Sequence, residues 1–377
     1  MSIRLDLNSA LPLNRVVGQT KVVQTLLDYV SVLETGAAMP NLALYADPGY
    51  GKTAIAKAIG AEMVRRLRVT DYRREVCFLN LKGTKNKTDA DMTDLFKIMA
   101  EALSGEGWPA TVILDEAFTE EARGSGNAEV TSILSKVGAD CKGGEVISIY
   151  GQGDFPYNPQ RLNFIILTWS PKRARADVMS RYPENEDLRF APYTVEELME
   201  IMHFAIPSYI MAKAKEFKGE ISVNHHARRF LAECMRGNAR DMEHGVCEPL
   251  YRRAILENGI SVDKAGALAL SVQKNLLPYG LNATEAKILH ELSLGQKLTS
   301  DELKARAGIS SKELFLSSQL YLRSQGGKAT PFQLRDSSDE PLPGKCGALI
   351  DISSKKWGIT NHGAVMVTRL RKGGWRI

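Results

Sequence analysis

The sequence has few cysteines, and none of them has the spacing of a metal site or a disulfide framework. The five cysteines lie far apart along the chain and form no Cys-x-x-Cys pair: Cys77, Cys141, Cys234, Cys247 and Cys346. Small secreted folds that depend on disulfides, and structural zinc sites, need cysteines grouped at short, regular intervals. We therefore expect neither a disulfide framework nor a zinc site.

Long hydrophobic runs are also missing. No apolar stretch approaches the ~20 residues that are needed to span a bilayer, and the first fifteen residues, MSIRLDLNSALPLNR, lack the apolar core of a signal peptide. We therefore expect an intracellular, cytoplasmic protein. The remaining composition is that of an ordinary globular chain, with 44% hydrophobic and 25% charged residues, and 377 residues are enough for two or three domains.

Acidic residues are missing from the C-terminal end. Residues 352–377 contain six Lys and Arg residues and no Asp or Glu, whereas the whole chain has a net charge of +5, so the preceding part sums to 5 − 6 = −1. A localised basic segment of this kind suits a phosphate backbone. The alternative is a basic tail that is merely solvated.

Apolar runs typical of buried parallel strands recur in the first half of the chain. They lie at 41–45, 76–80, 110–114 and 163–168, and amphipathic helical patterns separate them. Alternating strand and helix signals predict an α/β domain with a parallel sheet and flanking helices over residues 1–192.

A change to helical character begins at Thr194. Thr194 and Glu197 form a capping-box pattern, and we expect a helical domain without strands over residues 193–275. We assign residues 276–377 to a third domain.

The third domain has the spacing of a helix-turn-helix. Two helical patterns lie on either side of Gly308, and the second, at 311–324, is capped by Ser310 with Glu313 at its third position. β-Prone runs at 348–353 and 364–370 then predict a hairpin or wing. We expect a winged helix.

A glycine-rich loop follows the first predicted strand. The stretch ADPGYGKT, residues 46–53, matches Gly-x-x-x-x-Gly-Lys-Ser/Thr except that Ala46 replaces the first glycine. Six residues are candidates for binding the phosphates of ATP: Pro48, Gly49, Tyr50, Gly51, Lys52 and Thr53. Lys52 would neutralise the β- and γ-phosphates, and the Thr53 hydroxyl would bind Mg²⁺. The alternative is a coincidental or purely structural turn, because the motif is imperfect.

Two acidic residues end the third predicted strand. Asp115 and Glu116 follow TVIL, and in parallel sheets nucleotide sites lie at the carboxyl ends of the strands. Asp115 suits a Mg²⁺ ligand acting through water, and Glu116 suits orienting and deprotonating the attacking water. The alternative is a pair of acids that only ends a strand.

Polar and arginine residues further along complete the candidate site. Ser170, after the strand at 163–168, is best placed to contact the attacking water or γ-phosphate, with Thr168 as second choice. Arg181 precedes Tyr182 and a predicted short strand at 188–190, and could act on the site of a neighbouring subunit. Arg240, in RGNAR, could contact the γ-phosphate from the helical domain. Each arginine, taken alone, also fits an ordinary surface residue.

The order of these elements is that of an AAA+ ATPase, and the chain resembles the RuvB family of Holliday-junction branch-migration motors over nearly its full length. NRVVGQTKVVQTLLDYV resembles that family's opening segment, SIYGQGDFPYNPQRLNFIILTWS its hairpin after the acidic strand, SRY its arginine finger and GNAR its lid arginine motif. The resemblance implies that Val16 and Val17 contact adenine, that ATP and Mg²⁺ are bound, and that subunits form a hexameric ring on DNA. Departures from the family pattern include Ala46 and Asp47 at the phosphate loop.

Partners and function follow from the same resemblance. We expect a motor that translocates branched or duplex DNA; the alternatives are a clamp- or helicase-loader subunit, and a nucleotide-gated DNA- or protein-binding scaffold. In that family a junction-binding adaptor, RuvA, contacts the hairpin, so the resemblance implies an adaptor of this kind; the alternative, which the departures from the family pattern suggest, is a different partner.

The basic C-terminal residues are the candidates for DNA contact. They are Lys355, Lys356, Arg369 and Arg371, interleaved with Trp357 and Trp375. Contacts of this kind would be independent of sequence and sensitive to salt. The alternative is that both tryptophans pack in the domain core and that the helix serves protein contacts only.

Overall fold

The computed structural model describes most of the chain. The described residues are 3–8, 10–82, 86–118, 125–139, 143–168, 180–213, 219–274, 276–277, 281–311, 322, 350–353 and 356–372. They divide into two compact units, residues 1–191 and 192–377. Within the described residues, no helix combines the length and the apolar character that crossing a bilayer requires.

The first unit contains a four-stranded parallel sheet. The strands are β1 (Leu42–Tyr45), β2 (Glu75–Asn80), β3 (Ala110–Asp115) and β6 (Leu162–Thr168), in the order β1-β6-β3-β2. All three neighbouring pairs are parallel. The prediction of an α/β domain with a parallel sheet and flanking helices is confirmed, since the four predicted apolar runs form these four strands.

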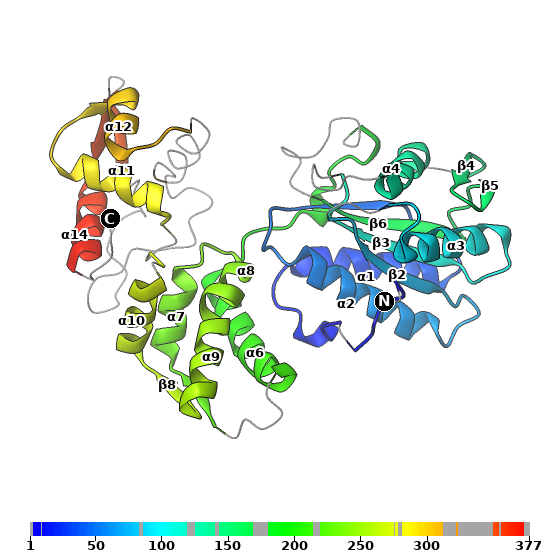
Figure 1. Ribbon diagram of the computed structural model, residues 1–377, viewed down its shortest axis with the longest axis horizontal. Helices are drawn as coiled ribbons and strands as arrows, with labels where there is room; N and C mark the ends of the chain where they lie inside the picture. The colour runs from blue at the N-terminus through cyan, green and yellow to red at the C-terminus, as the bar shows by residue number, and fades with distance from the viewer. Residues whose placement is uncertain are drawn as a thin grey trace. The chain divides into compact units, whose positions relative to one another are not determined.

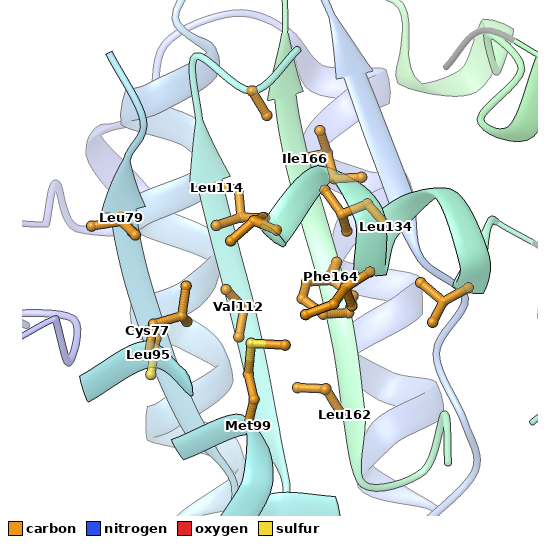
Figure 2. Packing of buried hydrophobic residues seen from close by; sticks show 14 of the residues in the cluster. Cys77, Leu79, Leu95, Met99, Val112, Leu114, Leu134, Leu162, Phe164 and Ile166 are labelled. Carbon is orange, nitrogen blue, oxygen red and sulfur yellow. The ribbon is translucent and has the colours of Figure 1, made fainter. Parts of the chain in front are cut away.

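Helices cover both faces of the sheet (Figure 1). They are α1 (Thr20–Glu34), α2 (Lys52–Leu67), α3 (Ala90–Ser104) and α4 (Ser125–Val137). Alternate strand residues point to opposite faces: Val112 and Leu114 pack in the core beneath α3 and α4, whereas Ile113 packs in the core beneath α1 and α2. Figure 2 shows the first of these cores, in which Phe164 of β6 lies among side chains of the neighbouring strands and helices. This double burial explains why the strands are continuously apolar.

Shorter elements complete the first unit. They are η1 (Leu13–Arg15), the hairpin of β4 (Val146–Ile149) and β5 (Gly153–Pro156), and η2 (Glu186–Leu188). The edge of β2 is covered by the N-terminal segment, because the Leu5 N–H donates to the Val76 carbonyl at 2.9 Å and the Phe78 N–H donates to the Ile3 carbonyl at 2.8 Å.

The predicted short strand at 188–190 is wrong. The Asn185 side chain accepts a hydrogen bond from the Asp187 N–H at 2.9 Å, and the chain turns into the 3₁₀ helix η2 at this point. Leu188 and Phe190 are both buried in the core beneath α1 and α2. Their alternate burial imitates the period of a strand, and this explains the mistaken prediction.

The second unit begins with a helical body. Its helices are α6 (Val195–Lys213), α7 (His225–Glu233), α8 (Ala239–Met242), the π-helical turn η3 (Glu243–Cys247), α9 (Glu248–Glu257) and α10 (Lys264–Lys274). The predicted capping box at the start of α6 is present: the Thr194 N–H donates to Glu197 Oε2 at 2.7 Å, and the Glu197 N–H donates to Thr194 Oγ1 at 3.1 Å.

The expectation that this body contains no strand is wrong. β7 (Ile221–Val223) and β8 (Ile260–Val262) form a two-stranded parallel sheet. Each strand is only the tripeptide Ile-Ser-Val, which is too short for a periodic signal, and the pairing joins segments that are remote in sequence.

The last part of the second unit combines helices with a small sheet. Its elements are α11 (Ala283–Ser293), β9 (Leu298–Thr299), α12 (Ser300–Ala307), β10 (Ile350–Ser353), β11 (Lys356–Ile359) and α14 (Asn361–Lys372). The strand order is β10-β11-β9 with antiparallel neighbours. As predicted, a helix ends at Gly308, which has φ 65°. The second predicted helix, at 311–324, lies almost entirely outside the described residues.

One of the two predicted β-prone runs is a strand and the other is not. The run at 348–353 contains β10, whereas the run at 364–370 lies inside the helix α14. Met366, Val367 and Leu370 are buried there, whereas Val365 is 43% exposed, which is the spacing of one helix face. The β-branched valines gave a strand signal that packing overrides.

Candidate nucleotide site

The glycine-rich loop lies between the carboxyl end of β1 and the first turn of α2. Gly49 and Gly51 have φ values of 90° and 85°, and Gly51 is the N-cap of α2. Side-chain-bearing residues rarely adopt such values, so glycine is required at both positions. A loop that ends in this way directs backbone N–H groups of the first helical turn outward, which is the arrangement that binds phosphate groups.

Ala46 occupies the position of the missing glycine without a positive φ. It is buried, and its N–H donates to the Thr168 carbonyl at 3.4 Å, which continues the pairing of β1 with β6. The Asp47 side chain is exposed to solvent. Of the two departures from the usual loop pattern, Ala46 therefore lies at the end of β1 and Asp47 lies on the surface.

Lys52, the first residue of α2, turns back over the loop. Its ammonium group donates hydrogen bonds to the carbonyls of Ala46 and, at 3.3 Å, Asp47. These carbonyls hold the positive charge next to the N–H groups of the loop, where anionic phosphates would bind.

Thr53 and Asp115 meet at the carboxyl end of β3. The Thr53 hydroxyl donates to Asp115 Oδ2 at 2.8 Å, although the two residues are 62 positions apart. Burial raises the pKa of the Asp115 carboxyl, the hydrogen bond from Thr53 opposes that rise, and the nearby Glu116 adds to it. A divalent cation at this point would offset the cost of burying the carboxylate, because oxygen ligands and negative charge are what Mg²⁺ requires.

Glu116 lies in the sharp turn that follows β3. Its φ is 57°, and its N–H donates to Asp115 Oδ1 at 3.0 Å. A left-handed conformation is uncommon for a glutamate and persists only where the surroundings compensate for its cost. The turn is fixed from below, because the Ala117 N–H donates to the Leu167 carbonyl at 3.1 Å.

Thr168 fixes the same turn rather than facing a ligand. Its hydroxyl is buried and donates to the Ala117 carbonyl at 2.7 Å. The second-choice contact with a γ-phosphate is therefore not retained for Thr168. Ser170, the first choice, lies outside the described residues.

Arg181 is exposed beside a firmly anchored neighbour. The Tyr182 ring is buried, its hydroxyl donates to the Leu134 carbonyl at 3.0 Å, and its own carbonyl accepts from the Tyr45 hydroxyl at 2.6 Å. The Arg181 carbonyl accepts from the Ala139 N–H at 3.1 Å. The backbone is thus fixed on both sides while the guanidinium group stays at the surface.

The segment that the resemblance assigns to adenine lies against the core beneath α1 and α2. Val16 is partly buried and packs against that core, and Val17 is buried. Next to them, Gln19 has φ 51°, and its side-chain amide pairs with the Ala191 backbone: Nε2 donates to the carbonyl at 2.6 Å and Oε1 accepts from the N–H at 3.1 Å. Nothing in the sequence marks this pairing, because the partner residues are 172 positions apart.

Arg240 belongs to the second unit and lies exposed in the short helix α8. The Asn238 side chain caps that helix by accepting from the N–H groups of Arg240 and Asp241 at 3.0 and 3.1 Å. Asparagine directly before a helix is a strong N-cap signal, so this feature of GNAR could have been predicted from the sequence.

The chain is similar to known proteins in part of its sequence and in its fold. No family model matches the chain. The proteasome-associated ATPase of Acidothermus cellulolyticus is 30% identical over 162 residues, which cover 37% of this chain and 27% of that protein. The chain therefore spans little more than a quarter of the length of this curated relative.

Solved structures are similar over the whole chain. The Thermotoga maritima RuvB Holliday junction branch migration motor has a TM-score of 0.54 at 15% sequence identity, covering 99% of this chain and 100% of that chain. A variant of the same Thermotoga protein gives the same values. The chain therefore shares the fold of this Thermotoga RuvB structure.

Proposed function

We propose that the chain is an ATP-hydrolysing motor that forms a hexameric ring and moves branched or duplex DNA. The observation that carries this proposal is the 2.8 Å hydrogen bond between Thr53 and Asp115, beside Lys52 and Glu116. It brings the helix that follows the phosphate loop and the end of the acidic strand to one point. A coincidental glycine-rich turn would not require that contact.

Each residue at this point has a chemical task. The N–H groups of residues 49–53 bind the phosphates of ATP, and Lys52 neutralises them. Thr53 and Asp115 would hold Mg²⁺, which would supply further neutralisation of phosphate charge. Glu116 orients the attacking water and accepts its proton.

Other groups complete the site around the phosphates. We assign Ser170 to the attacking water or γ-phosphate, Arg240 to the γ-phosphate within the same chain, and Arg181 to the site of the neighbouring subunit. Val16 and Val17 contact adenine. The exposure of Arg181 beside the anchored Tyr182 supports its role between subunits.

We assign residues 193–275 to the lid of the ATPase and residues 276–377 to a winged helix. The order α11, β9, α12, then β10 and β11 supports the second assignment, since β11 lies between β9 and β10 as the central strand. In such a domain a helix and a hairpin approach DNA together.

Two of the four candidate DNA contacts have described side chains. Lys356 is exposed on β11, and the exposed Arg371 donates to His290 and Ser293 of α11 at 3.1 and 3.2 Å. Lys355 and the Arg369 side chain lie outside the described part. Trp357 is not available to DNA: it is 2% exposed, and its Nε1 donates to Ser300 Oγ at 3.0 Å.

The test is steady-state ATP hydrolysis with four-way, linear duplex and single-stranded DNA. We expect hydrolysis by the wild type, with the largest stimulation by four-way or duplex DNA. Glu116→Gln should slow turnover by about 100-fold or more, because a positioned general base contributes roughly that factor. ATP binding by this variant should persist.

Glu106→Gln is the matched control, since this exposed glutamate lies in the same unit away from the loop. It should hydrolyse ATP like the wild type. Normal turnover by Glu116→Gln would disprove the site, and hydrolysis that no DNA stimulates would disprove the DNA motor. Stimulation without movement along DNA would favour a loader.

A further inference from the structure

Segment 236–240 carries Arg240. It is bound at two places, and the first is residues 192–193, at the start of the second unit. The Tyr193 N–H donates to the Gly237 carbonyl at 3.0 Å. Gly237 has φ 74°, and a Cβ atom there would lie 2.6 Å from Pro192 Cβ and 2.9 Å from the Tyr193 carbonyl oxygen. Only glycine fits this close approach. The segment and residues 192–193 therefore move together.

The same segment is fixed secondly to α11. Arg236 Nη1 lies 2.9 Å from Glu285 Oε1, and the Glu285 side chain is only 1% exposed. The other carboxylate oxygen of Glu285 accepts from the Asn282 N–H at 2.9 Å, in the capping box that begins α11. The buried carboxylate is thereby bound by one donor from the segment and one from the helix it caps.

The backbone of Arg236 is itself held in an unfavourable conformation. Its φ is 51°, followed by the positive φ of Gly237, so two left-handed residues stand in succession. Arginine adopts this conformation only where the surroundings compensate for it. The ion pair with Glu285 is a directional contact that does so.

Arg240 is oriented from this same short segment. The Asn238 side chain caps the turn that carries it, through the N–H groups of Arg240 and Asp241. A shift of Arg240 therefore requires a shift of Asn238 and of the neighbouring Arg236, because only Gly237 separates them.

We infer that Arg236 and Glu285 are positioning residues that couple the nucleotide contact of Arg240 to the orientation of α11 and the C-terminal domain. The inference rests on the proposed function, in which Arg240 binds the γ-phosphate. When Arg240 binds the phosphate, segment 236–240 is displaced. The ion pair between Arg236 and the buried Glu285 carboxylate transmits this displacement and changes the orientation of α11. Phe230 packs against the core of the helical body and against the core that contains α11. This apolar contact does not fix the orientation of α11 as a hydrogen-bonded ion pair does.

The experiment is hydrogen exchange of the full-length chain with Mg²⁺ and either ADP or the slowly hydrolysed analogue ATPγS. Peptides over 51–60 report nucleotide binding, and peptides over 283–293 report α11. In the wild type we expect protection at 51–60 and a difference of about fivefold in α11 exchange between the two nucleotides, the lower end of ordinary coupling.

Glu285→Gln is the decisive variant. Glutamine at this position preserves the capping box but not the charge, so α11 keeps its cap. We expect unchanged protection at 51–60 and loss of the nucleotide-dependent difference in α11. Arg236→Lys, which keeps the charge but not the planar guanidinium, should retain part of the difference.

Arg253→Gln is the control, because it breaks an exposed ion pair with Glu257, 2.7 Å long, on α9. It should leave the α11 difference intact. A full difference in Glu285→Gln would overturn the inference, as would a wild type protected at 51–60 with no response in α11. Absence of protection at 51–60 in the wild type would instead overturn the proposed function, and the inference with it.

Discussion

Ala46 departs from the motif at a position outside the left-handed part of the loop. The phosphate loop needs left-handed backbone at Gly49 and Gly51, and both positions have it. Ala46 precedes that part of the loop and continues the pairing of β1 with β6. The methyl group lies in the core beneath α1 and α2 rather than near the N–H groups.

Restoring the usual glycine should therefore bring no gain. We expect Ala46→Gly to leave the rate of ATP hydrolysis and the KM for ATP within about twofold of the wild type. It should lower the free energy of unfolding by about 0.5–1 kcal/mol, because glycine gives the unfolded chain more freedom. Parallel measurements of hydrolysis and thermal unfolding check both parts. A large rise in activity would show that the alanine strains the loop.

The position of a single residue could be predicted where a local sequence pattern determines it, and not where a distant contact does. The place of Asp115 and Glu116 at the carboxyl end of a buried strand could be predicted from the sequence, because they follow an apolar run and a parallel sheet gathers such ends at one edge. The pairing of Gln19 with Ala191 could not, because it joins residues 172 positions apart. No periodicity or motif records a contact of that kind.

At the level of elements, the four strands of the parallel sheet could be predicted because burial on both faces makes each of them a short, continuous apolar run. The failures share a cause, which is that local pattern and tertiary pairing disagree. Residues 188–190 alternate in burial while ending a 3₁₀ turn, and 364–370 contain β-branched residues in a helix that packing stabilises. The three-residue strand β7 becomes a strand only by pairing with β8.

The N-terminal segment is an element that protects a sheet edge. Ile3 is 4% exposed and packs in the core beneath α3 and α4, and its carbonyl accepts from Phe78 of β2. Pairing of this kind removes the free edge that would otherwise favour association with another strand. The side chain of the neighbouring Arg4 forms an exposed ion pair with Glu75, 3.3 Å long.

Ile3→Ala should consequently loosen β2 far more than Arg4→Ala. We expect a loss of about 2 kcal/mol for the buried isoleucine and less than about 1 kcal/mol for the exposed pair. Hydrogen exchange over 75–80 measures this, with a rate increase of roughly 30-fold expected for Ile3→Ala, the factor that 2 kcal/mol implies if these amides exchange by opening of the edge. Equal rates in the two variants would show that the segment does not stabilise the edge.

At the scale of the whole molecule, the proposed function assigns site residues to both compact units and to a neighbouring subunit. Lys52, Thr53, Asp115 and Glu116 belong to the first unit and Arg240 to the second. Arg181 stands on an anchored backbone with its side chain at the surface. In the proposed ring, this exposed arginine would reach the phosphates bound by a neighbouring subunit.

Mixing two inactive variants tests that geometry. Lys52→Ala lacks the phosphate-binding lysine and Arg181→Ala lacks the arginine given to a neighbour, so each alone should hydrolyse ATP at least about 100-fold more slowly than the wild type. In a random 1:1 mixed ring, about one interface in four pairs an intact Lys52 with an intact Arg181 from the neighbour, if sites act independently. Hydrolysis should therefore recover to about a quarter of the wild-type rate.

Lys52→Ala mixed with Glu116→Gln is the matched control. Both defects lie on the nucleotide-binding side of an interface, so every site remains inactive and no recovery is expected. Light scattering establishes that both mixtures form rings of the same size. Equal rings without recovery in the first mixture would place Arg181 outside the site of the neighbouring subunit.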